Sequence, residues 1–145
     1  MLSYNEQLQF ALELAIQKHK NQKDKSGKPY ILHPLHVMET VKSDDAKIVA
    51  ILHDIIEDTD VTEKDLLNAG LSKHIVDAIV MLTRTDDIDY MDYVKKVSSN
   101  PLAKEVKLAD LQHNMDLRRI STLTEKDLDR TRKYQIAYHY LINTK

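Results

Sequence analysis

The chain has 145 residues, 42% hydrophobic and 30% charged, which suits one globular domain that builds its own core. Two glycines and three prolines are too few for the many tight turns of an all-β fold, so the composition favours helices. A net charge of −2 provides no broad basic field for DNA or RNA, and the absence of cysteine excludes disulfides, Cys-ligated zinc and thiol nucleophiles.

Short capping patterns mark several helix ends along the chain. Ser3 with Glu6 forms a capping-box pattern ahead of residues with apolar i, i+3, i+4 spacing. Thr124 with Asp127 repeats this pattern near the end of the sequence. Gly70 is a natural residue to follow a helix, because glycine readily adopts the left-handed backbone conformation found there.

Amphipathic or apolar segments separated by polar loops predict the order of the helices. In chain order, the predicted helices span about residues 4–20, 34–42, 44–56, 62–70, 72–82, 90–98, 102–117 and 124–142. The acidic segment 83–89 is predicted to be a loop, and no segment keeps a strand-like alternation for long. The sequence therefore predicts an all-α fold, a single compact bundle of about seven or eight helices over residues 1–145.

No segment resembles a targeting or membrane-spanning sequence. The first nine residues have no basic start and no apolar core, so a signal peptide is not expected. No stretch approaches the roughly 20 apolar residues that span a bilayer. The sequence predicts a cytoplasmic protein with neither a membrane nor a nucleic acid as its partner, and it leaves the oligomeric state open.

The sharpest candidate site is His53-Asp54, because this pair lies within the apolar run 51–56 of a predicted helix. An ionised carboxylate on a mostly buried helix is unfavourable unless it is paired or binds a metal. Glu57 and Asp58 each follow one member of the pair by four residues, so four polar side chains should gather along one side. The alternative interpretation is a helix with a polar edge, in which these side chains only bond to one another.

Two further segments add candidate metal ligands. Asp110, His113 and Asn114 share one face of a predicted helix through i+3 and i+4 spacing. His33 lies just ahead of another predicted helix, where Pro34 fixes its approach. Each segment alone is more typical of a solvated helix face or a cap. Together, imidazole and carboxylate groups are a usual ligand set for zinc, manganese or iron, with coordination positions left open for water and substrate.

With these residues in view, the sequence resembles the HD-domain superfamily of metal-dependent phosphohydrolases. The resemblance is strongest to the hydrolase domain of the bifunctional stringent-response enzymes and to their small stand-alone relatives. Three stretches match in the family's order: SGKPYILHP at 26–34, ILHDIIEDT at 51–59, and VKLAD at 106–110 with Asn114-Met115. Any one of these motifs is weak evidence, whereas three linked motifs are specific.

The resemblance implies a role for each residue that matches the family pattern. The implied ligands of one divalent metal ion, with manganese as the usual ion, are His33, His53, Asp54 and Asp110. The implied catalytic carboxylates, which position and activate the attacking water, are Glu57 and Asp58. The implied contacts to a small-molecule nucleotide substrate are Lys25, Ser26, Asn114 and Tyr134.

The reaction implied by the resemblance is hydrolysis of the 3′-pyrophosphate of guanosine tetra- or pentaphosphate to GDP or GTP and pyrophosphate. Asp24, Leu111, Asp116 and Leu117 depart from the family pattern, where basic residues or threonine are common, and each is expected to remove a nucleotide or phosphate contact. Two alternatives therefore stay open. One is an HD phosphohydrolase acting on another nucleotide or phosphoester, and the other is a non-catalytic helical module that binds a metal or a nucleotide.

Overall fold

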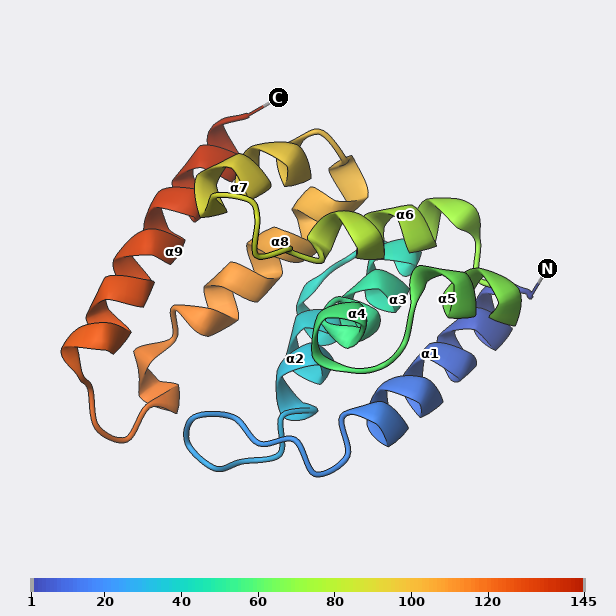
Figure 1. Cartoon of the computed structure of the whole chain (residues 1–145), viewed down its shortest axis with the longest axis horizontal. Helices are drawn as coiled ribbons and strands as arrows, with labels where there is room; N and C mark the ends of the chain where they lie inside the picture. The colour runs from blue at the N-terminus through green and yellow to red at the C-terminus, as the bar shows by residue number, and fades with distance from the viewer. Residues whose placement is uncertain (1, 145) are drawn as a thin grey trace.

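The computed structural model describes residues 2–144, which form nine α-helices and one 3-10 turn and contain no β-strand (Figure 1). The first helices are α1 (Tyr4–Lys18), α2 (Leu32–Thr40), α3 (Asp44–Leu52), α4 (Ile55–Asp58) and α5 (Glu63–Ala69). They are followed by α6 (Lys73–Leu82), α7 (Tyr90–Ser98), α8 (Pro101–Asn114), the turn η1 (Leu117–Arg119) and α9 (Glu125–Asn143). The predicted all-α class is confirmed, while the two end residues of the predicted domain 1–145 lie outside the described residues.

The helix predicted over 44–56 is in fact two helices, and the prediction of one continuous helix was wrong. α3 ends before His53, and Asp54 precedes α4 as its N-cap residue, with non-helical backbone angles of φ −105° and ψ 3°. The backbone N–H and the ring Nδ1 of His53 both lie within hydrogen-bond reach of the Ala50 carbonyl, so the chain tightens to an i→i−3 bond here. The two predicted ligands therefore occupy a bend between helices instead of one helix face.

The second predicted helix begins earlier than expected. α2 starts at Leu32, so His33 lies within the first helical turn and not ahead of the helix. Pro34 is tolerated in this turn because the first backbone N–H groups of a helix have no partner within it. This shift places His33 on a rigid helix that faces the molecular interior.

The predicted helix caps are confirmed. Ser3 Oγ accepts a hydrogen bond from the Glu6 N–H while the Glu6 carboxylate accepts one from Ser3, and Thr124 and Asp127 form the same reciprocal pair. Gly70 ends α5 with φ 104°, in the left-handed region that favours glycine. These bonds act within one helical turn, so they fix where the helices begin and end.

Thr124→Ala is expected to lower the free energy of unfolding by about 1 kcal/mol, because α9 loses the side-chain acceptor that caps its first turn. Urea unfolding followed by circular dichroism measures this change. Thr124→Ser is the matched control, since it keeps the hydroxyl and should retain most of the stability. Equal stability of the two variants would show that the cap contributes nothing measurable.

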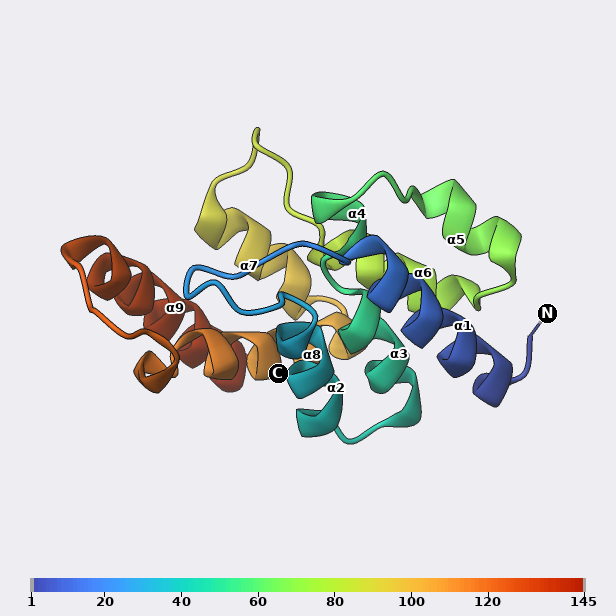
Figure 2. The same cartoon turned by 90° about the horizontal axis from the view of Figure 1, so that it is seen from below.

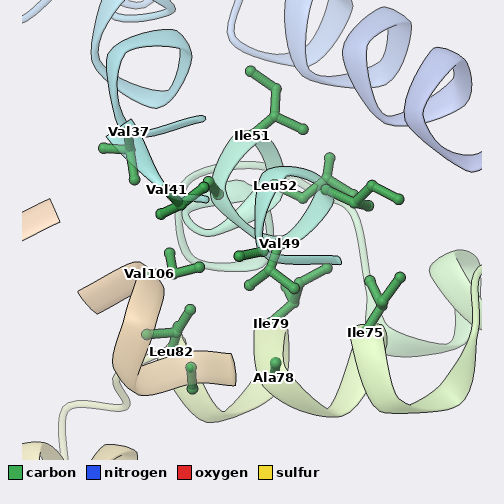
Figure 3. Close-up of a cluster of buried hydrophobic side chains, with 14 of the residues drawn as sticks. Val37, Val41, Val49, Ile51, Leu52, Ile75, Ala78, Ile79, Leu82 and Val106 are labelled. Atoms are coloured by element: carbon green, nitrogen blue, oxygen red, sulfur yellow. The ribbon is translucent and has the colours of Figure 1, made fainter. Parts of the chain in front are cut away.

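The apolar run of α3 forms the centre of the core. All five residues from Ile48 to Leu52 are fully buried, and α3 packs against α1, α2, α6 and α8. Figure 3 shows Val49, Ile79 and Val106, from α3, α6 and α8, facing the same interior space. In both Figure 1 and Figure 2, α7 and α9 lie towards one end of the molecule, and α1 and α5 lie at the other. Among the described helices, none is both long and apolar enough to cross a membrane.

Candidate metal centre and active site

One cavity of about 480 Å³ brings together all ten residues that the sequence singled out. They are contributed by the loop before α2, by α2 itself, by the bend between α3 and α4, by α4, and by α8 and α9. Their positions in the sequence range from 25 to 134, so only the packing of distant helices gathers them. The roles assigned to these ten residues remain predictions.

Three of the four predicted ligands form a compact cluster, and the fourth contacts it. One ligand atom each from His33, His53 and Asp54 lies within 4.8 Å of the others. Asp110 Oδ1 lies 2.8 Å from His33 Nε2 and 3.4 Å from His53 Nε2. His33 comes from α2, the His53-Asp54 pair from the bend after α3, and Asp110 from α8, so three packed elements fix the arrangement.

The orientation of His53 points to a cation. His53 Nδ1 lies 2.6 Å from the Ala50 carbonyl oxygen, which can only accept, so the ring hydrogen is on Nδ1. The lone pair of the neutral ring is then on Nε2, which is buried and has no hydrogen-bond partner. This atom lies 3.2 Å from Asp54 Oδ2 and 3.4 Å from Asp110 Oδ1. Three electron-pair donors therefore face one another, an arrangement that a divalent cation stabilises.

The electrostatics of Asp54 favour the same interpretation. Burial raises the pKa of Asp54 well above its usual range, and the negative charges of Asp110 and Asp58 raise this pKa further. The Tyr30 hydroxyl donates a hydrogen bond to Asp54 Oδ2. Ionised Asp54 is thus unfavourable without a nearby positive charge, and a bound cation would supply that charge.

Asp110 is held in the opposite state, as a stable anion. Although burial opposes its ionisation, the Lys107 ammonium holds the pKa of Asp110 well below its usual range. Lys107 Nζ lies 3.0 Å from Oδ2, and Asn114 donates its amide to Oδ1 at 3.0 Å. Asp110 Oδ1 therefore faces the cluster while Oδ2 is bound by lysine.

His33 is oriented by a second imidazole. His33 Nδ1 lies 2.8 Å from His113 Nδ1, and the two rings are stacked within 5° of parallel. Burial and the nearby Arg119 guanidinium lower the pKa of His113 to about 4, so its ring is neutral near neutral pH and can accept from His33. A hydrogen on His33 Nδ1 leaves the Nε2 lone pair directed at the cluster.

The predicted catalytic carboxylates lie next to the cluster on α4. Glu57 Oε1 accepts the backbone N–H of Arg84 at 3.0 Å, and Asp58 Oδ2 accepts from the Gln22 amide at 3.1 Å. Both side chains line the cavity, and both retain a carboxylate oxygen for a water molecule. The structure thus positions them beside the cluster without defining which one takes a proton.

Two of the four predicted substrate contacts are already hydrogen-bonded to other protein groups, and the other two line the cavity. Ser26 Oγ donates to the Arg119 carbonyl at 2.7 Å, and the Asn114 amide is bound to Asp110, so both side chains already have protein partners. Lys25 lines the cavity with a pKa lowered by burial and by the nearby Arg130. Tyr134 lies on α9 and also lines the cavity.

Two of the four departures from the family pattern, Leu111 and Leu117, do not line the cavity. Leu111 is fully buried in the core, and Leu117 lies in the turn η1; the expectation that each removes a substrate contact stays a prediction. The two acidic departures, Asp24 and Asp116, do line the cavity. Asp24 accepts the backbone N–H groups of Ser26 and Lys28, and Asp116 pairs with Arg118.

Several cavity residues received no role from the sequence. Tyr30 and Lys107 lie within matched motifs, and the i, i+3 spacing of Lys107 and Asp110 was a signal that could have identified their pairing. Arg84, Tyr90 and Lys133 lie outside every motif, and only the packing of the loop 83–89, α7 and α9 brings them to the cavity.

Comparisons with known proteins agree with the fold and the motifs. A GTP pyrophosphokinase of Myxococcus xanthus is 37% identical over 114 residues, which cover 67% of this chain and 15% of that protein. A guanosine-3′,5′-bis(diphosphate) 3′-pyrophosphohydrolase of Aquifex aeolicus is 45% identical over 65 residues, which cover 42% of this chain and 9% of that protein. The chain therefore spans only a small part of the length of these curated relatives.

A solved structure and a family model extend the comparison to most of the chain. The structure, described as a metazoan ortholog of SpoT that hydrolyzes ppGpp, matches with a TM-score of 0.74 and 22% identity. The match covers 96% of this chain and 87% of that one, which shows a shared fold. The HD domain model matches residues 11–128, a range that contains the four clustered histidine and aspartate residues. The chain belongs to the HD domain family.

Proposed function

We propose that the protein is a metal-dependent phosphohydrolase that removes the 3′-pyrophosphate of guanosine tetra- or pentaphosphate. The observation that carries this proposal is the His53 Nε2 lone pair, buried without a partner and directed at two carboxylates. His33, His53, Asp54 and Asp110 would hold one divalent cation. Nitrogen and oxygen donors suit manganese as well as zinc or iron, and the family resemblance favours manganese.

Different residues of the cavity can carry out the separate steps of this hydrolysis. A divalent cation in the cluster would neutralise charge on a phosphoryl group and lower the pKa of a water molecule. Glu57 or Asp58 would accept the proton as the water oxygen bonds to the phosphorus nearest the ribose. The bond from that phosphorus to O3′ breaks, and O3′ takes up a proton to become the ribose hydroxyl. Lys25 would offset the charge of the departing pyrophosphate.

The choice of a guanosine polyphosphate rests on the relatives. The Aquifex aeolicus protein is named as a 3′-pyrophosphohydrolase of guanosine bis(diphosphate), and the structural neighbour is described as hydrolysing ppGpp. The aspartates at positions 24 and 116 support the competing candidate, an HD phosphohydrolase that acts on another nucleotide or phosphoester, because each places negative charge in the cavity. A cytoplasmic location stays a prediction.

A substrate panel with Mn²⁺ tests this function. We expect release of pyrophosphate from guanosine tetraphosphate, and a reduction of about 10²–10⁴-fold in Glu57→Gln, because the variant loses the proton acceptor but no metal ligand. Calorimetry should show unchanged Mn²⁺ affinity in that variant. Glu39→Gln, at an exposed position on α2, is the matched control and should retain full activity.

Other outcomes of the panel lead to different functions. Turnover of NADPH, a dinucleotide or a mononucleotide, without turnover of guanosine tetraphosphate, would identify the protein as a phosphohydrolase of another substrate. If the protein neither binds Mn²⁺ nor hydrolyses any of these compounds, the result would favour the third alternative, a non-catalytic helical binding module.

A further inference from the structure

A second group of side chains lines the cavity and takes no part in the proposed metal centre. Tyr90 begins α7, and two cations lie over its ring: Lys133 Nζ at 4.5 Å and the Arg84 guanidinium at 5.2 Å from the ring centroid. Lys133 comes from α9, which packs against α7, and Arg84 comes from the loop between α6 and α7 (Figure 1). Cation–π contacts therefore fix two positive charges beside one aromatic ring.

The hydroxyl of Tyr90 lacks a partner in this group. Within residues 2–144, three buried side-chain polar atoms have no hydrogen-bond partner: His19 Nε2, His53 Nε2 and Tyr90 Oη. Only the last two belong to residues that line the cavity, and His53 lies in the proposed metal centre. Burial raises the pKa of Tyr90, so the hydroxyl keeps its hydrogen and can donate it to an incoming acceptor.

The charges of Arg84 and Lys133 are not offset by carboxylates. Among the ion pairs of the described residues, neither side chain has an acidic partner, whereas the neighbouring Arg130 is paired with Asp127. Burial lowers the pKa of Lys133, and repulsion from Arg84, Lys107 and Arg130 lowers it further. The group is therefore positive, and it can lower its own repulsion by binding an anion.

The charge of the whole cavity favours an anion with several negative groups. Seven acidic and seven basic side chains line the cavity, so a divalent cation would make its net charge positive. Five of the basic side chains form no ion pair with a carboxylate among the described residues: Lys23, Lys25, Arg84, Arg119 and Lys133. Of these five, Arg84 and Lys133 lie together over the Tyr90 ring. One phosphate group at the metal would leave these two cations without a partner.

We propose that Arg84, Tyr90 and Lys133 form a second anion subsite, which binds a phosphate group of the substrate other than the one that is attacked. This inference rests on the proposed function and assigns the phosphates at the second position of the substrate, the 5′ phosphates of guanosine tetraphosphate, to residues outside the motifs. The guanidinium and ammonium groups donate charge-assisted hydrogen bonds to phosphate oxygens, and the Tyr90 hydroxyl adds a neutral donor. A nucleotide with a single phosphorylated position would leave the subsite empty.

Binding of inorganic pyrophosphate to the metal-free full chain tests the subsite without any turnover. In calorimetric titrations with EDTA present, Lys133→Gln and Arg84→Gln are each expected to raise the Kd for pyrophosphate about 10-fold. Arg84→Gln keeps the backbone N–H that binds Glu57. Arg132→Gln is the matched control on α9, because that exposed arginine pairs only with Asp129 at the surface. Equal Kd values in Lys133→Gln and Arg132→Gln, or no binding by the wild type, would overturn the proposal.

Kinetics with two substrates then separate the subsite from the proposed function. For guanosine tetraphosphate, Lys133→Gln should raise KM about 10-fold with kcat nearly unchanged, because a bond shared by ground and transition states is lost. For guanosine 3′-diphosphate, which lacks the 5′ phosphates, the same variant should match the wild type. An equal loss on both substrates would place Lys133 at the attacked group and refute the subsite. If the wild type hydrolyses neither nucleotide while pyrophosphate binding still depends on Lys133, the proposed function fails and the subsite stands.

Discussion

Asp54→Asn is expected to abolish hydrolysis while it stabilises the metal-free protein. The loss of activity should reach roughly 10³-fold or more, because the proposed metal centre would lose an anionic ligand whose charge stabilisation is worth several kcal/mol. The gain in stability follows from the raised pKa of Asp54, which burial and the neighbouring Asp110 and Asp58 cause. A metal ligand whose removal stabilises the empty protein is the expected behaviour of a strained functional site.

The pH dependence of this gain has a definite sign. A carboxyl group whose pKa is higher in the folded than in the unfolded chain loses stability as the pH rises through the folded value. At neutral pH, ionised Asp54 therefore destabilises the empty fold, and asparagine, which cannot ionise, does not. The difference in Tm between Asp54→Asn and the wild type should be largest at neutral pH and should vanish below about pH 4, where the unfolded carboxyl is protonated too.

Thermal unfolding with EDTA and with Mn²⁺ measures both effects. At 100 times its Kd, Mn²⁺ should stabilise the wild type by about 2.7 kcal/mol and leave Asp54→Asn almost unchanged. Asp77→Asn, at an exposed residue that pairs with Lys73 on α6, is the matched control and should respond to Mn²⁺ as the wild type does. A variant that gains as much stability from Mn²⁺ as the wild type would contradict Asp54 as a ligand. A variant that is less stable than the wild type without Mn²⁺ would contradict the destabilising effect of ionised Asp54.

The helices could be predicted from the sequence because their signals are local. The capping boxes at Ser3 and Thr124 and the glycine at position 70 each act over about one turn, and each occurs where the pattern placed it. The break after Leu52 could not be predicted in this way. This break depends on the hydrogen bonds that the His53 ring and the His53 backbone N–H both make to the Ala50 carbonyl. An apolar run of good helix formers gives no sign of these bonds.

The site could be predicted only where residues belong to motifs. The motif residues from His33 to Asp110 do meet in one cavity, although the resemblance and not the spacing supplied their roles. Periodicity cannot indicate which distant segments meet, so Arg84, Tyr90 and Lys133 gave no signal before the packing of α7 and α9 was known. A motif also does not show which of its side chains face the site, since Leu111, next to the predicted ligand Asp110, faces the core.

Lys107→Met is expected to lower the free energy of unfolding of the metal-free protein by about 3–5 kcal/mol. Lys107 is buried on α8, with Nζ 3.0 Å from Asp110 Oδ2 and 5.2 Å from the centroid of the Tyr93 ring. Removal of the ammonium leaves a buried carboxylate without its strongest counter-charge, while methionine fills most of the lysine volume. Lys95→Met, at an exposed position on α7, is the matched control and should stay within about 0.5 kcal/mol of the wild type.

The Lys107→Met/Asp110→Asn double variant distinguishes lost charge pairing from lost packing. If the unpaired Asp110 carboxylate causes the destabilisation, its neutralisation should recover at least about half of the loss, giving a coupling energy above about 1 kcal/mol in the double-mutant cycle. Mn²⁺ should also stabilise the Lys107→Met single variant, because a cation at the cluster would compensate the same carboxylate. A double variant no more stable than Lys107→Met would instead assign the loss to the buried methylene stem of the lysine. Recovery in the double variant would therefore show that Lys107 keeps Asp110 ionised, with Oδ1 directed at the cluster. No recovery would show that Lys107 contributes mainly through packing.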